Sequence, residues 1–169
     1  MNEQILYDEI FKLLEKENTE LEKLTGKGIF FAPELYIAFI LGKKIKEKEQ
    51  KIFGKQVEWL REVNFGNIGP TDLAFKTENE IYVFEIKLRE TYFKYINDIN
   101  KLNELDNNYK KYFLALVDTW ESQLNDDKRI KKIEENSSSL QAINIKNFQT
   151  KQDRYDGNIS CVVGLWRLD

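Results

Sequence analysis

Two short apolar runs constrain the fold of this chain more than any other feature. Residues 71–76 and 80–88 flank the polar segment 77–79, a pattern typical of a β-hairpin. The register of such a hairpin follows from its turn. A two-residue turn at Glu78 and Asn79 is the simplest connection between runs this close in sequence.

This register brings three charged side chains together in mid-sheet. Asp72 lies opposite Glu85, with Cβ atoms about 5 Å apart, and Lys87 shares their face because side chains alternate along a strand. A register shift of one residue would move apolar side chains onto the charged face, so the pattern argues against it. Strands seldom carry charge in mid-sheet without a reason. The opposite face is apolar and must be buried: Leu73, Phe75, Tyr82, Phe84, Ile86 and Leu88.

Two carboxylates this close repel each other and need a cation or a shared proton. Mg²⁺ suits them, because it prefers oxygen ligands and is often held by one or two carboxylates plus a substrate phosphate. Such an ion polarises a phosphodiester and lowers the pKa of a bound water, which becomes the nucleophile. Lys87 points into the same space and could orient that water or neutralise developing charge. The alternative is a cross-strand salt-bridge cluster that only solvates one face of the sheet.

Glu34 is a third candidate carboxylate. Residues 31–48 are predicted to form a helix with Pro33 in its first turn, where proline is tolerated. A lone carboxylate on an apolar helix face is unfavourable unless it has a partner. We therefore expect this face to pack beside the hairpin and to direct Glu34 to the metal; the alternative is a favourable charge at the helix N-terminus. The other residues on the same side of this helix as Glu34 are apolar: Ile37, Ala38, Leu41 and Ile45.

These residues together resemble the PD-(D/E)xK nuclease superfamily, which includes many restriction endonucleases and DNA-repair nucleases. Its pattern is an upstream helical Glu, a Pro-Asp near the start of a strand, and (Asp/Glu)-x-Lys on the next strand. Glu34, Asp72 and Glu85-Ile86-Lys87 match these positions. The chain departs from the pattern at Thr71, which separates the proline from Asp72. The resemblance covers about residues 25–118.

The resemblance implies a metal-dependent phosphodiesterase acting on DNA, most simply an endodeoxyribonuclease, with RNA not excluded as a substrate. Asp72 and Glu85 would bind Mg²⁺ (or Mn²⁺) with help from the Ile86 carbonyl. Lys87 would position or deprotonate the attacking water, and Glu34 would complete the site directly or through water. A polar residue of the following helix often joins such sites, and the candidates here are Lys94, Asn97, Asp98 and Lys101. The rival interpretation is a catalytically inactive nuclease-like fold that binds nucleic acid or protein.

The composition excludes other chemistries. The chain has no histidine and one cysteine, which excludes Ser-His-Asp and Cys-His catalysis and argues against a structural zinc site. The segment 26–28, Gly-Lys-Gly, lacks the spacing of a phosphate-binding loop. Cys161 lies in an apolar run, so we expect a buried thiol in a protein of the reducing cytoplasm. We expect no membrane partner, because the N-terminus is polar and no apolar run approaches spanning length.

A net charge of −3 is unusual for a protein that binds nucleic acid. Positive charge is instead local, in two clusters that could bind phosphates in a salt-dependent way. Neighbouring acids favour the simpler interpretation of ordinary solvated faces. An acidic chain is also compatible with a homodimer that gathers its basic residues in one shared cleft. The first cluster comprises Lys43, Lys44, Lys46, Lys48, Lys51 and Lys55, and the second Lys128, Arg129, Lys131 and Lys132.

The whole pattern predicts an α/β fold with a mixed central β-sheet flanked by helices, a restriction-endonuclease-like α/β/α core. We expect one domain, residues 1–169, with an N-terminal helical segment over about 1–48. A helix between strands 80–88 and 111–118 implies that these two are parallel. Residues 3–24 are expected to form one helix or two short ones, and further helices are expected at 91–108 and about 120–136. Further strands are expected at 56–64 and about 160–167. Loops are expected at 137–139 and 150–158, either as simple connectors or in contact with substrate.

Overall fold

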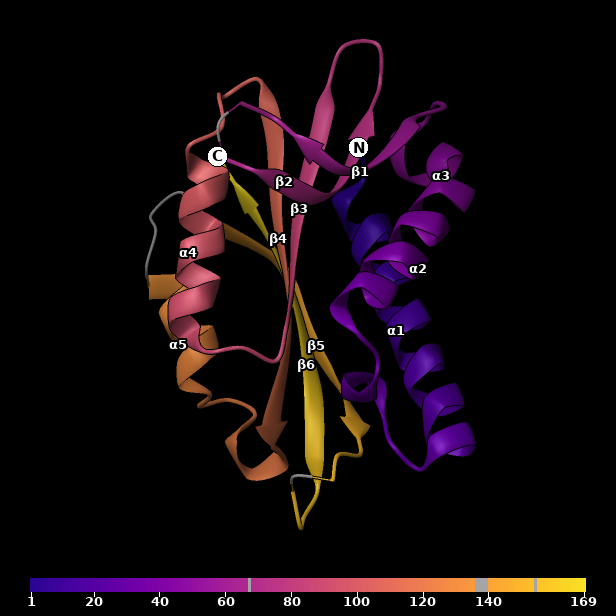
Figure 1. The fold of residues 1–169 in the computed structure, drawn as a ribbon, viewed down its shortest axis with the longest axis vertical. Helices are drawn as coiled ribbons and strands as arrows, with labels where there is room; N and C mark the ends of the chain where they lie inside the picture. Colours follow the sequence, from indigo (N-terminus) through magenta and orange to yellow (C-terminus); the bar gives the residue numbers. More distant parts are fainter. Residues whose placement is uncertain (67, 136–139, 154) are drawn as a thin grey trace.

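The computed structural model describes residues 1–66, 68–135, 140–153 and 155–169, and its centre is a six-stranded mixed sheet (Figure 1). The strand order is β1-β2-β3-β4-β6-β5. β3 and β4 are parallel, and the other neighbouring pairs are antiparallel. The mixed α/β class and the parallel pair are therefore confirmed. The strands are β1 (Glu58–Asn64), β2 (Pro70–Lys76), β3 (Ile81–Leu88), β4 (Tyr109–Trp120), β5 (Leu140–Thr150) and β6 (Ile159–Leu168).

Helices cover both faces of the sheet (Figure 1). On one face lie α1 (Glu3–Thr25), α2 (Glu34–Glu47) and α3 (Glu49–Phe53), and on the other lie α4 (Tyr92–Asn103) and α5 (Lys128–Glu135). Two short 3-10 turns, η1 (Ile29–Phe31) and η2 (Glu121–Gln123), join longer elements. Within the described ranges, no helix has both the length and the apolar character needed to cross a membrane.

The predicted hairpin and its register are confirmed. Leu73 pairs with Phe84, and the Thr77 N–H donates to the Glu80 carbonyl at 2.9 Å, so Glu78 and Asn79 are the two central turn residues. The apolar face of the hairpin is buried against α1, α2 and α3. The other face is turned toward α4, where Ala74 and Val83 join a second apolar core. The charged residues of β2 and β3 therefore belong to the α4 side of the sheet.

The helix predicted for 31–48 begins only at Glu34. Ala32 is extended, because the residue before a proline avoids the helical region. Residues 29–31 consequently form a separate turn, and Pro33 precedes the helix instead of lying in its first turn. The apolar stripe of this helix is buried as predicted.

Other boundaries differ modestly from the prediction. The N-terminal segment is one helix, ended by Gly26 in a left-handed conformation with φ of 75°. The helix predicted at 91–108 ends at Asn103. The helix predicted near 120–136 is wrong in its first half, because β4 continues through Trp120 and α5 begins at Lys128. Cys161 is buried in β6, as expected.

Two elements were not expected from the sequence, α3 and β5. β5 is a sheet edge with many exposed polar side chains, and a register shift between Ala142 and Asn144 interrupts its alternation. Half-exposed, irregular edge strands give weak periodicity, so the pattern did not reveal this one. The predicted loop 137–139 lies outside the described residues. The predicted loop 150–158 connects β5 to β6, although Thr150 itself belongs to β5.

Candidate active site

Asp72 and Glu85 meet where the backbone ladder between β2 and β3 ends. Leu73 and Phe84 form the last backbone pair, and the next residue on each strand is Asp72 or Glu85. Beyond that point a side chain joins the strands: Asp72 Oδ2 accepts a hydrogen bond from the Ile86 N–H at 2.7 Å. The Ile86 carbonyl lies on the same edge of β3 as its N–H. The predicted carboxylate pair therefore has a main-chain oxygen directed to the same side.

Neighbouring cations compensate only part of the negative charge of the carboxylate pair. Glu85 is only 3% exposed. Burial, together with the negative charge of Asp72, raises the pKa of Glu85 to about 8. Lys101 opposes this shift, with its Nζ 2.6 Å from Glu85 Oε1 and 2.6 Å from the Pro70 carbonyl. At neutral pH Glu85 must therefore hold a proton or attract a further cation.

Lys87 lies between carboxylates supplied by two helices. Its Nζ is 3.3 Å from Glu34 Oε1 of α2 and 3.2 Å from Asp98 Oδ2 of α4. Burial disfavours the charged ammonium, but the charges of Asp98 and Glu34 outweigh that effect and raise the pKa of Lys87. Lys87 is therefore held as a fixed ammonium beside the carboxylate pair.

Glu34 packs beside the hairpin as predicted, but both of its carboxylate oxygens contact β3, and its expected role as a metal ligand stays a prediction. In addition to Lys87, it accepts a hydrogen bond at 2.9 Å from the Leu88 N–H. Within the described part of the chain, no three Asp, Glu, His or Cys side chains gather closely enough to hold a metal. The protein ligands for a metal here would be Asp72, Glu85 and the Ile86 carbonyl. One or two carboxylates with several waters are what Mg²⁺ commonly uses, so this donor set fits that ion.

The structure distinguishes among the four α4 residues that the sequence left open. Asp98 contacts Lys87 and Lys101 contacts Glu85, whereas Lys94 pairs with Glu90 at the surface and Asn97 is exposed. The sequence contained a signal that could have identified Asp98 and Lys101. Asp98 and Lys101 each precede a buried residue of the α4 stripe, and their i, i+3 spacing places them on one side of the helix.

The two basic clusters are partly neutralised by neighbouring acids. In the first, Lys44 pairs with Glu9 at 3.0 Å and Lys46 with Glu49 at 2.6 Å. Lys44 is ten residues from Glu34 along α2, a distance of about 15 Å. In the second, Arg129 pairs with Asp118 and Asp127, and Lys131 with Asp126. These contacts favour the interpretation of ordinary solvated or structural charges.

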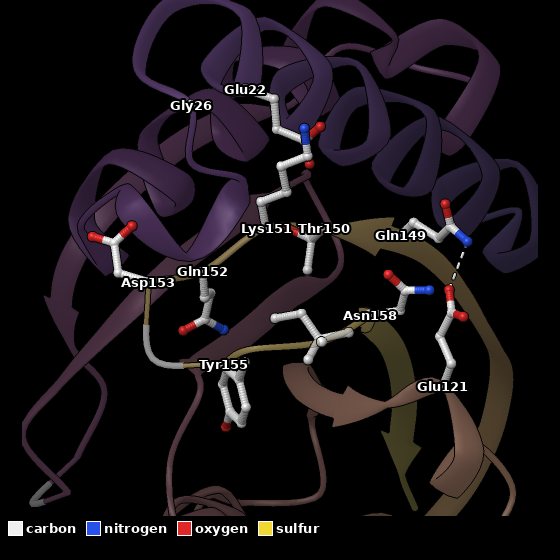
Figure 2. Close-up of a pocket in the computed structure, with 12 residues that line it drawn as sticks. Glu22, Gly26, Glu121, Gln149, Thr150, Lys151, Gln152, Asp153, Tyr155 and Asn158 are labelled. Atoms are coloured by element: carbon white, nitrogen blue, oxygen red, sulfur yellow. Dashed lines mark hydrogen bonds between the residues drawn. The ribbon is translucent and has the colours of Figure 1, made fainter.

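Two pockets lie at the end of the sheet where β3, β4 and β5 finish. One, of about 340 Å³, is lined mostly by Gln149–Asp153 and by residues just before β6, with Glu121 bonded to Gln149 at its rim (Figure 2). The candidate site residues Asp72, Glu85, Lys87 and Glu34 do not line it. A second pocket, of about 310 Å³, shares Lys151, Gln152 and Asp153 with the first and extends to Arg89, just beyond β3.

Comparisons with protein-family models, with curated proteins and with solved structures give no match to this chain. The chemistry of the site is therefore inferred from its geometry.

Proposed function

We propose that this chain is a Mg²⁺-dependent nuclease, most simply an endodeoxyribonuclease, with its site at Asp72, Glu85 and Lys87. The observation that carries the proposal is a pair of opposed carboxylates, one of them buried, on the strand face that also carries the Lys87 ammonium. A purely structural cluster would give each carboxylate its own cation, yet among the described residues Asp72 forms no ion pair. The arrangement resembles that of the PD-(D/E)xK nucleases.

Each side chain has a separate role in the proposed reaction. Asp72, Glu85 and the Ile86 carbonyl would hold the cation. Bound Mg²⁺ supplies a Lewis acid that polarises the phosphodiester and acidifies a bound water. Lys87, held as an ammonium, donates to the attacking water or to a phosphate oxygen, which positions the water and stabilises the charge that develops on the phosphate. Glu34 and Asp98 position Lys87.

A second candidate is a nuclease-like fold that binds nucleic acid or protein without catalysis. The ion pair between Lys101 and Glu85 favours it, since an ammonium there partly neutralises Glu85 without a metal. The net charge of −3 also favours a partner other than DNA. The position of Asp72 beside a second, buried carboxylate argues against this candidate, because a binding module has no need for the repulsion between them.

Incubation of the purified protein with nucleic acids tests the activity directly. The substrates are closed-circular plasmid, linear duplex, single-stranded DNA and RNA, each with Mg²⁺, with Mn²⁺ or with EDTA. We expect cleavage with either metal and none in EDTA, and nicking of the plasmid would identify internal cleavage. Failure to cleave any substrate with either metal, or cleavage that persists in EDTA, would contradict the proposal.

Metal binding predicts a thermal shift that separates the two candidates. Mn²⁺ should raise the melting temperature of the wild-type protein, because a ligand of the folded state stabilises it by about 2.7 kcal/mol at a hundred times its dissociation constant. Asp72→Asn should lose most of this shift, whereas Asp106→Asn, at an exposed position, should keep it. An equal shift in both variants would place the metal elsewhere, and no shift in the wild type would favour the binding module.

A further inference from the structure

The pocket beyond β3 combines positive charge with exposed aromatic surface. Its walls include three cations, two phenylalanines and one acid: Lys27, Arg89, Lys151, Phe30, Phe31 and Asp153. Asp153 pairs with Lys27 at 2.5 Å, so Arg89 and Lys151 remain as an excess of positive charge. The local charge is therefore opposite in sign to the net charge of the chain, which suits an anionic ligand.

Two residues of the pocket lie close in sequence to residues of the candidate active site. Arg89 is the second residue after Lys87, and Phe31 is the third residue before Glu34. The hydrogen bond from the Leu88 N–H to Glu34 holds these two segments side by side. Two residues of extended chain span at most about 7 Å. The Cα atoms of Lys87 and Arg89 therefore lie within about 7 Å of each other, so Lys87 and the pocket are neighbours at the end of β3.

The pocket holds aromatic and cationic groups of the kinds that bind a nucleotide. Phe31 is 53% exposed, so part of its ring is accessible to a ligand, and Lys27 Nζ lies 5.1 Å from its ring centroid. The Arg89 guanidinium lies 5.9 Å from the centroid of Phe30 and donates to Gln152 Oε1 at 2.6 Å, which fixes its position. Proteins that bind single strands combine exposed aromatic rings, on which bases stack, with cations that track the phosphates.

We propose that this pocket binds one unpaired nucleotide of the substrate strand, with its base against Phe31 and its phosphate against Arg89 and Lys151. A base inside a duplex is stacked on its neighbours and cannot lie on Phe31. The preferred substrate is therefore a single strand. This inference rests on the proposed nuclease function, which supplies the reason for a strand to pass Lys87.

Binding in EDTA tests the pocket without cleavage. The probe is a fluorescein-labelled single-stranded oligonucleotide, compared with its duplex by fluorescence anisotropy at several salt concentrations. We expect the wild type to bind the single strand more tightly than the duplex. Phe31→Ala should weaken single-strand binding about tenfold, the size of one lost stacking contact, and Phe31→Trp should retain it. Lys151→Ala should reduce the salt slope by about one.

Leu24→Ala is the matched control, because Leu24 is an apolar side chain of α1 that is 82% exposed and lies outside this pocket. It should bind as the wild type does. Tighter binding of the duplex, or wild-type affinity in Phe31→Ala, would overturn the inference whether or not the protein cleaves DNA. A dimer that Phe31→Ala dissociates would assign the surface to a second copy instead. Selective loss of single-strand binding in Phe31→Ala, in a protein that cleaves nothing, would retain the pocket and reject the nuclease.

Discussion

Alanine in place of Asp72 or Glu85 should abolish Mg²⁺-dependent cleavage, and alanine in place of Lys87 should strongly reduce its rate. The two carboxylates are the only acidic side chains proposed to hold the cation, so loss of either should remove the Lewis acid. Loss of the Lys87 ammonium should remove a donor aimed at developing charge, an effect of about a hundredfold to a thousandfold on the rate. Initial rates of cleavage, measured on the best substrate from the direct assay, check the prediction.

Controls must separate lost chemistry from lost structure at Lys87. Its removal leaves the half-buried carboxylate of Asp98 without its cation, which destabilises the fold. Lys87→Met combined with Asp98→Asn should recover stability without recovering cleavage. Lys76→Met, at an exposed position on the same hairpin, should leave both stability and cleavage at the wild-type level. Undiminished cleavage by a folded Asp72→Ala protein would refute the assignment of the site.

Without metal, wild-type stability should fall as the pH rises, and Glu85→Gln should flatten this trend. The pKa of Glu85 is raised from an ordinary value of 4.5 to about 8. Between these two pH values the folded state binds a proton that the unfolded state has released. The contribution of Glu85 to the free energy of unfolding is therefore full below about pH 4.5 and lost by about pH 8. At about 1.4 kcal/mol per pH unit, this shift corresponds to about 5 kcal/mol in total.

Urea denaturation at pH 5, 6, 7 and 8 in EDTA measures this effect. The stability difference between Glu85→Gln and the wild type should shift in favour of the variant as the pH rises. Glu78→Gln, in the exposed turn of the hairpin, should keep the wild-type slope. Saturating Mg²⁺ should reduce the wild-type slope, because the bound ion compensates the ionised pair. Parallel stability profiles for the wild type and Glu85→Gln would show that Glu85 does not hold the extra proton.

Local pattern was enough to predict the centre of the proposed site. Alternation in two apolar runs and a short polar turn determine which residues of a hairpin face each other, and these signals are contained in residues 71–88. The opposition of Asp72 and Glu85 followed from that pattern. The apolar stripe of α2 likewise identified Glu34 as a carboxylate in need of a partner. Strand β4 was evident because burial on both faces leaves a continuous apolar run.

Tertiary structure alone decided which distant groups complete the site. Glu34 and Lys87 are 53 positions apart, and their ion pair depends on how α2 packs on the end of β3. The choice of Asp98 and Lys101 depends on the position of α4 over the same strand, and the pocket at Arg89 depends on the connection between β5 and β6. Periodicity reports which face of an element is buried. It carries no information about which element covers that face, because that is set by packing between segments far apart in the chain.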